Sequence, residues 1–139
     1  MCSVPLLTSL CLLAGMFALA GCGGDQGIAR YELSGQIKFD GKSVPMGYIR
    51  FIPDKKQGNQ GPGTSATILD GHYKTIQDLG TVGGPHIAKI VGTDGIPYKT
   101  PGGVPIPIGR PLFPEIVENI DLPNESGAVH DFDLTSVKE

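Results

Sequence analysis

The sequence predicts an all-β domain, an antiparallel sandwich of about seven strands behind an N-terminal signal segment. Three observations lead to this prediction. The 21 glycines and 12 prolines make up about a quarter of the 139 residues, which favours short strands and turns over long helices. Apolar and polar residues alternate in several short runs, and none has the period of an amphipathic helix. Asp-Gly pairs and glycine-rich bends separate these runs.

An apolar N-terminal run is the first element. The 17 residues from Val4 to Ala20 carry no charge, and they are too few for a spanning helix, so residues 1–21 are predicted to be a secretory signal peptide. The run ends in Leu-Ala-Gly-Cys, a lipobox pattern that would attach lipid to the thiol of Cys22. No Lys or Arg precedes it, so either the amino group supplies the usual positive charge or translation starts elsewhere. We therefore expect a lipoprotein of the cell envelope, anchored to a membrane and facing the periplasm or the exterior.

The cysteines limit the chemistry of the mature chain. Cys2 and Cys11 lie in the predicted signal peptide, and Cys22 would be consumed by lipid. The remaining domain then has no thiol for a disulfide, a metal or a nucleophile.

A short tether at 22–30 precedes the predicted domain at 31–135. Alternating residues predict its strands at 31–39, 47–53, 66–69, 72–75, 86–91, 117–122 and 129–134. The strongest turn signal is Asp70-Gly71, and a two-residue hairpin at this pair places Ile68 opposite Tyr73 in the core.

A proline-rich excursion at 96–114 interrupts the strand pattern. Six of its 19 residues are proline, which predicts an extended, polyproline-like segment without strand pairing. Long loops of this kind are often either functional or mobile. The predicted contact surface consists of its apolar residues Val104, Ile106, Ile108, Leu112 and Phe113.

Several motifs carry a resemblance to a known family. Residues 35–45, Gly-Gln-Ile-Lys-Phe-Asp-Gly-Lys-Ser-Val-Pro, and then 47–53 resemble the opening of small, planctomycete-type bacterial lipoproteins with a carboxypeptidase-regulatory-like (transthyretin-like, or prealbumin-like) domain. Further similar segments are 70–73, 83–90 and 131–134, so the resemblance covers about residues 33–134. His86 departs from the pattern, which usually has an aromatic residue there. The resemblance implies a sandwich fold and a lipid anchor, and it implies no catalytic residues.

Other chemistries find weaker support in the sequence. A net charge of −3 disfavours nucleic acid as a partner. Gly41-Lys42-Ser43 lacks the spacing and the following helix of a phosphate-binding loop. The histidines, which have no metal-ligand spacing, are His72, His86 and His130. The C-terminal acids, which could hold calcium but are expected on a solvated surface, are Asp121, Glu125, Asp131 and Asp133.

These observations predict a lipid-anchored envelope domain with a non-catalytic binding or structural role. We expect no enzymatic activity, no cofactor and no metal. The expected partners are the membrane, through the N-terminal lipid, and an envelope protein or polymer. The alternatives are an accessory to an envelope enzyme, a carbohydrate-binding module and a metal-binding module. The absence of Trp weakens the carbohydrate alternative, because sugar rings stack on aromatic side chains.

Overall fold

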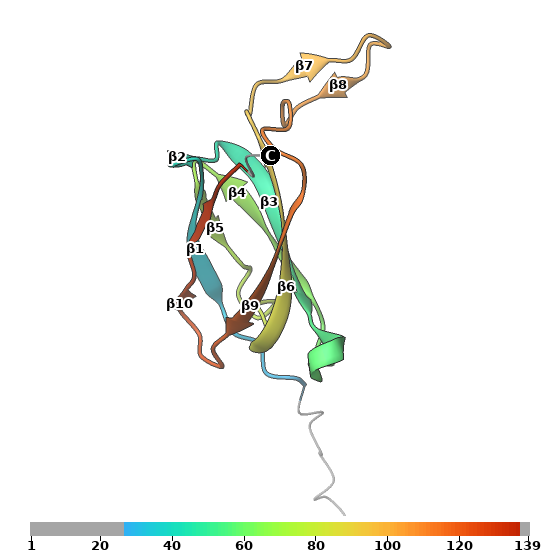
Figure 1. The fold of residues 1–139 in the computed structure, drawn as a ribbon. Helices are drawn as coiled ribbons and strands as arrows, with labels where there is room; N and C mark the ends of the chain where they lie inside the picture. The colour runs from blue at the N-terminus through green and yellow to red at the C-terminus, as the bar shows by residue number, and fades with distance from the viewer. Residues whose placement is uncertain (1–26, 137–139) are drawn as a thin grey trace, which may run out of the picture.

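The computed structural model describes residues 27–136, and within them nine strands pair into one curled sheet that forms the body of the domain (Figure 1). The strands are β1 (Leu33–Phe39), β2 (Lys42–Ser43), β3 (Met46–Pro53), β4 (Thr64–Leu69), β5 (His72–Lys74), β6 (Gly84–Thr93), β7 (Tyr98–Lys99), β8 (Pro105–Ile106), β9 (Ile116–Leu122), β10 (Ala128–Val129) and β11 (Phe132–Leu134), with a 3-10 helix η1 (Lys55–Gln57). The order across the sheet is β10-β1-β5-β4-β3-β6-β9, β2 and β11 also pair with β1, and β7 and β8 form a separate pair.

The all-β prediction is confirmed, and each predicted strand is present within a few residues. The curled sheet is consistent with a β-sandwich. The last predicted strand, 129–134, is divided into β10 and β11, and both run parallel to β1, whereas the prediction was antiparallel. The reason lies in the topology: β9 ends at the same end of the sheet at which β1 begins, so the chain must run alongside β1 in the same direction. The last strands thereby cross from one edge of the sheet to the other.

The core lies inside the curl, where alternate side chains of each strand meet. In β3 the burial alternates residue by residue, with Ile49 and Phe51 fully buried, as the period of two predicts. Three aromatic rings pack at the centre, with centroids 5.7 to 6.5 Å apart: Phe51, Tyr73 and Phe132. The core therefore rests on aliphatic and aromatic packing.

The hairpin at Asp70-Gly71 forms as predicted. Ile68 pairs with Tyr73, and both are buried. Asp70 and Gly71 have φ angles of 49° and 79°, the backbone of a tight hairpin turn that suits the twist of the strands. The local sequence alone fixes this register.

A glycine in β1 admits the parallel strand. A Cβ at Gly35 would lie 1.9 Å from the carbonyl oxygen of His130, so no larger residue fits there. The N–H of His130 in turn donates to the carbonyl of Ser34 at 2.9 Å. Gly35, the one residue that lowers the strand propensity of β1, is therefore also the residue against which the C-terminal segment packs.

The sheet has two distinct ends (Figure 1). The N-terminal end consists of residues 27–32 and the loops 54–63, 75–83 and 123–127. The arm end consists of the turns at 40–41 and 70–71 and the excursion between β6 and β9. The chain enters the body at the first of these ends, and the excursion leaves it at the other (Figure 1).

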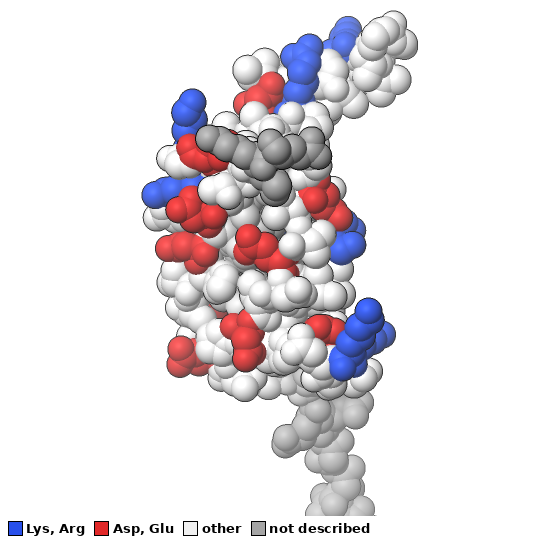
Figure 2. All heavy atoms as spheres, in the orientation of Figure 1, with Lys and Arg blue, Asp and Glu red and all other residues white. Residues whose placement is uncertain are grey.

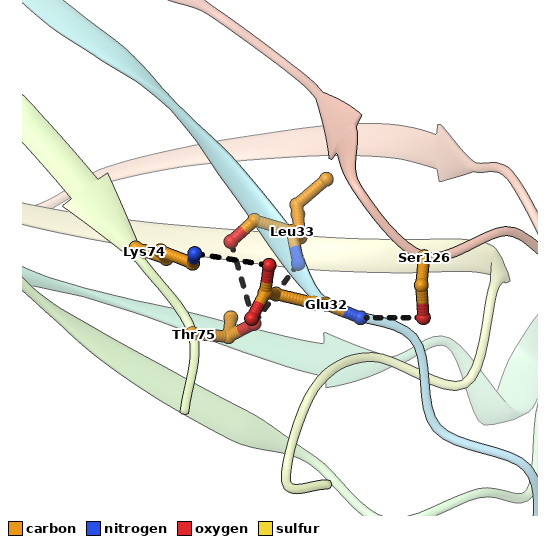
Figure 3. A network of polar contacts seen from close by, with 5 residues as sticks. All are labelled: Glu32, Leu33, Lys74, Thr75 and Ser126. Atoms are coloured by element: carbon orange, nitrogen blue, oxygen red, sulfur yellow. Dashed lines mark hydrogen bonds and ion pairs between the residues drawn. The ribbon is translucent and has the colours of Figure 1, made fainter. Parts of the chain in front are cut away.

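Polar contacts hold the start of β1 in place at the N-terminal end (Figure 3). The ammonium of Lys74 lies 3.0 Å from the carboxylate of Glu32. The hydroxyl of Thr75 accepts from the N–H of Leu33 at 3.0 Å, and the N–H of Glu32 donates to the hydroxyl of Ser126 at 3.4 Å. These contacts join β1 to β5 and to the turn before β10.

Arg30 fastens the chain before β1. Its guanidinium donates to the carbonyl oxygens of Gly63 at 3.2 Å, Leu79 at 2.9 Å and Gly80 at 2.9 Å. The residue at the end of the predicted tether is thus attached to the body. Within residues 27–136, no helix is long and apolar enough to cross a membrane.

Candidate functional site

The proline-rich segment forms a β-hairpin that projects from the body (Figure 1). We call residues 95–110 the arm. β7 pairs with β8, with Tyr98 opposite Ile106 and Lys99 opposite Pro105. The expectation of an extended segment without strand pairing is wrong for this part. A proline is tolerated in so short a ladder because an edge strand needs few N–H donors.

The base of the arm is held by the carboxylate of Asp94. Its Oδ1 accepts from the backbone N–H groups of Ile96 and Arg110, each at 2.9 Å. These two bonds, with the nearby charge of Arg110, hold the pKa of Asp94 below its ordinary value. Next to it, the hydroxyl of Thr93 hydrogen-bonds to the carbonyl of Ile108. Both strands of the arm are thereby tied to the end of β6.

Gly109 is required by this clamp. Its φ is +87°, and a Cβ at this position would lie 1.9 Å from Oδ1 of Asp94. Neither Asp94 nor Gly109 was identified from the sequence as a residue of the site. The signal was present, because Asp94-Gly95 is a turn pair that opens the segment and Gly109 closes it.

The arm is basic, whereas acidic side chains are spread over the body (Figure 2). Between residues 95 and 114 the sequence has Lys99 and Arg110 and no Asp or Glu. The guanidinium carbon of Arg110 lies 4.3 Å from the centre of the Tyr98 ring, a cation–π contact that stiffens the hairpin. The arm therefore presents positive charge on an ordered support.

Four of the five predicted contact residues lie on the surface of the arm or at its root. Val104, Ile108 and Leu112 are exposed and Ile106 is half-buried. Ile96, which the prediction left out, is also exposed, at 62%. A shallow groove of about 400 Å³ runs across the hairpin, lined by Pro97, Tyr98, Lys99, Pro105, Ile106 and Pro107. The groove offers proline and aromatic surface next to an ammonium group.

Phe113 is the exception, and its assignment to the contact surface is corrected. It is 6% exposed and belongs to the core, with its ring centroid 4.5 Å from that of Phe39. The physical reason is that the chain has already returned to the sheet, since Pro111 bridges to Thr93 at the end of β6. A Cβ on Gly92 would lie 2.5 Å from this ring, so the glycine makes room for it.

A mainly apolar cavity lies at the root of the arm. It has a volume of about 440 Å³ and is lined by Phe39, Leu112, Phe113, Pro114, Glu115, Ile116, Thr135 and Ser136. Its one charged lining residue is Glu115, which pairs with Arg50 at 3.0 Å. Leu112, which lines the cavity, lies two residues after the end of the arm.

The three histidines lie in different environments. His72 is exposed beside the Asp70 turn, with Nδ1 2.9 Å from the carbonyl oxygen of Asp70. His86 is 1% exposed, with Nδ1 2.8 Å from the carbonyl oxygen of Gly84. The half-buried His130 packs its ring edge-on against Phe132. Each has a local structural contact of its own.

The C-terminal acids are on the surface as expected. Asp121, Glu125, Asp131 and Asp133 are all exposed, and Asp131 accepts from the N–H of Gln36 at 2.8 Å. In the part of the chain that the structure describes, no three His, Cys, Asp or Glu side chains form a group that could hold a metal ion.

The predicted lipidation site, Cys22, lies outside the described residues. The arm and the cavity at its root are therefore the candidate site within the described part of the chain. No model of a known protein family matches this sequence, and no curated protein is similar to it.

Proposed function

We propose that the chain is a lipid-anchored binding domain of the cell envelope with no catalytic role. In this proposal the body is a transthyretin-like sandwich held at a membrane through lipid on Cys22. The arm is the surface that contacts a partner. The lipobox pattern at residues 19–22 supports the anchor, and the geometry of the domain supports the arm.

One observation carries the proposal: the arm projects from the end of the body opposite to the end at which the chain enters (Figure 1). A domain anchored through residues before Gly27 would present its arm away from the membrane. The clamp at Asp94 and the Tyr98–Arg110 contact keep this hairpin ordered although most of its surface is in solvent. An ordered projection binds with a smaller loss of conformational entropy than a mobile loop.

The chemistry of the arm indicates the kind of partner. It combines exposed aliphatic side chains with Lys99 and Arg110 and has no acid of its own. Such a surface fits a protein or polymer that is apolar and at least partly anionic.

In-cell photo-crosslinking tests this proposal. A photoreactive amino acid replaces Val104 on the arm or Val117 on β9, which are 57% and 53% exposed. The two valines thus form a matched pair that differs in location. We expect a discrete cross-linked product of the membrane fraction from position 104 and none from position 117. Equal products from both positions, or none from 104, would refute the arm as the contact surface.

The anchor is tested separately by mass spectrometry of the N-terminal peptide. We expect the mature chain to begin at an acylated Cys22. A chain that begins elsewhere, or an unmodified thiol, would refute the lipoprotein assignment and leave the cross-linking result to be explained by another anchor.

A further inference from the structure

The N-terminal end of the body carries three exposed aliphatic side chains. Ile28, Ile76 and Leu79 are 62%, 66% and 52% exposed. Ile76 and Leu79 flank one tight turn, in which the N–H of Leu79 donates to the carbonyl of Ile76 at 3.1 Å. Ile28 precedes Arg30, whose guanidinium binds the carbonyl of Leu79. The three residues therefore belong to neighbouring segments of the same end.

These side chains are presented on a fixed support. Arg30 joins the incoming chain to the loop that carries Leu79, and the hydroxyl of Thr64 donates to the same carbonyl. Tyr31 bridges to Thr81 in the same loop, with N–O distances of 2.7 and 2.9 Å. Arg30 and Tyr31 thus hold the incoming chain against the loop, and Thr64 holds the same loop against β4. Exposed aliphatic groups on an ordered surface are suited to a stable apolar contact.

The length of the chain limits what these residues can meet. Six residue steps separate Cys22 from Ile28, and they span at most about 22 Å when fully extended. This step rests on the proposed function: if Cys22 is acylated, its sulfur lies at the surface of the bilayer. Ile28 then stays within that distance of lipid at all times, and the effective concentration of lipid at this end is high.

We propose that the N-terminal end of the body rests on the lipid surface, with Ile28, Ile76 and Leu79 inserted between head groups. The contact is apolar and not electrostatic, because this end carries both signs of charge, with Lys55 and Lys56 on one loop and Asp78 and Glu125 on others. Three side chains bind lipid weakly by themselves, but the tether makes the contact intramolecular. The contact would orient the body and direct the arm away from the membrane.

Tryptophan fluorescence tests the inference directly, since the chain has no Trp of its own. Leu79→Trp places a reporter at the N-terminal end, and Leu69→Trp places one at the arm end. Leu79 and Leu69 are 52% and 57% exposed, so the two variants are matched in residue type and in exposure. The full acylated proteins are reconstituted in neutral phosphatidylcholine vesicles, with or without bromine on the acyl chains.

We expect brominated lipid to quench about half of the fluorescence of the Leu79→Trp variant, because an interfacial contact reaches about 5–10 Å into the bilayer boundary. The Leu69→Trp variant should lose almost none. The quenching should persist in high salt, because the contact is apolar. Equal quenching of both variants, or none in either, would overturn the inference.

Two further measurements keep the outcomes separate. Mass spectrometry of each reconstituted protein establishes that Cys22 is acylated. If the Leu79→Trp variant is acylated and its fluorescence is not quenched, only the contact between the N-terminal end and lipid is rejected. If Cys22 is unmodified, the proposed anchor is rejected. If Leu79→Trp unfolds, Ile76→Trp at the other side of the same turn replaces it and should be quenched in the same way.

Discussion

Asp94 and Arg110 close the base of the arm through two hydrogen bonds that run in opposite directions. The N–H of Arg110 donates to the carboxylate of Asp94 at 2.9 Å, and the N–H of Asp94 donates to the carbonyl of Arg110 at 3.0 Å. Arg110 lies sixteen positions after Asp94 in the sequence. The arm is therefore a closed loop with a defined root, and its properties can be tested separately from those of the body.

The two hydrogen bonds that the Asp94 carboxylate accepts should weaken as the pH falls. The hydrogen bonds from Ile96 and Arg110 lower the pKa of Asp94 in the folded state. Their contribution is present above the ordinary carboxyl pKa of 3.8 and is lost as the pH falls through the lower folded value. We expect the amide NMR shifts of these two residues to titrate with a midpoint below the ordinary carboxyl value of 3.8.

A matched pair of variants controls this experiment. Asp94→Asn keeps a side-chain oxygen that can accept both bonds, and Asp94→Ala removes it. Amide exchange at Ile96 and Arg110 should be faster in the alanine variant than in the asparagine variant. A titration of the wild-type shifts centred above pH 4, or equal exchange in both variants, would contradict the clamp.

The outer part of the arm should be dispensable for stability, while its base should not. In the described structure, residues 99–106 make hydrogen bonds only within the arm. Replacing them with Gly-Ser-Gly should change the Tm by less than about 3 °C. Gly109→Ala should lower the Tm by about 8 °C, because the strained backbone and the clash with Asp94 cost about 1–3 kcal/mol. Differential scanning calorimetry of both variants decides this, and a larger loss from the trimmed arm would contradict it.

Adjacent residues at the root of the arm should differ sharply in their contribution to stability. Phe113→Ala should cost about 3 kcal/mol, because it removes a ring packed against Phe39 in the core. Leu112→Ala should cost less than about 1 kcal/mol, since that side chain is 41% exposed. Urea titrations of the two variants measure both values. Similar losses would show that Phe113 lies on the surface, as the sequence pattern alone predicts.

The buried phenol of Tyr73 should make the folded protein less stable at alkaline pH. Burial, with the nearby charge of Asp131, raises the pKa of Tyr73 above its ordinary value of 10.0. The stability linked to this group is complete below that value and is lost as the pH rises, because the unfolded phenol ionises first. Tyr73→Phe removes the 2.6 Å bond to the carbonyl of His130 and should cost about 1 kcal/mol at neutral pH.

The same variant checks the direction of this effect. The difference in unfolding free energy between wild type and Tyr73→Phe should be smaller at about pH 11 than at neutral pH. A difference that grows with pH would mean that the phenol ionises more easily in the folded state than in the unfolded one.

Local signals account for the parts of the fold that were predicted correctly. The alternation in β3 and the Asp70-Gly71 pair involve residues close together in the sequence, so the strand and the Ile68–Tyr73 register follow from them. The parallel pairing of β11 with β1 could not be predicted in this way. It depends on the end of the sheet at which β9 stops, and the residues 132–134 do not themselves specify which strand they pair with.

The candidate site was predicted in outline and missed in detail for a related reason. Proline content indicates a segment that leaves the sheet, but the hairpin depends on a bond from Asp94 to a residue sixteen positions later. Phe113 has the same apolar character as Leu112, and only its position after the return to the sheet places it in the core. Composition identifies such a segment, and long-range contacts decide which of its side chains remain accessible.

The arrangement of the two ends has a mechanical consequence. Tension between the start of β1 and the root of the arm would enter the sheet at one end and leave through the last residue of β6 at the other. The load would run along the strands and across the hydrogen bonds of each strand pair from β1 to β6, of which β3 and β6 pair over eight residues. Bonds perpendicular to the pull must break together and not one after another. A domain loaded in this direction would yield in shear, the geometry in which a sheet resists force best.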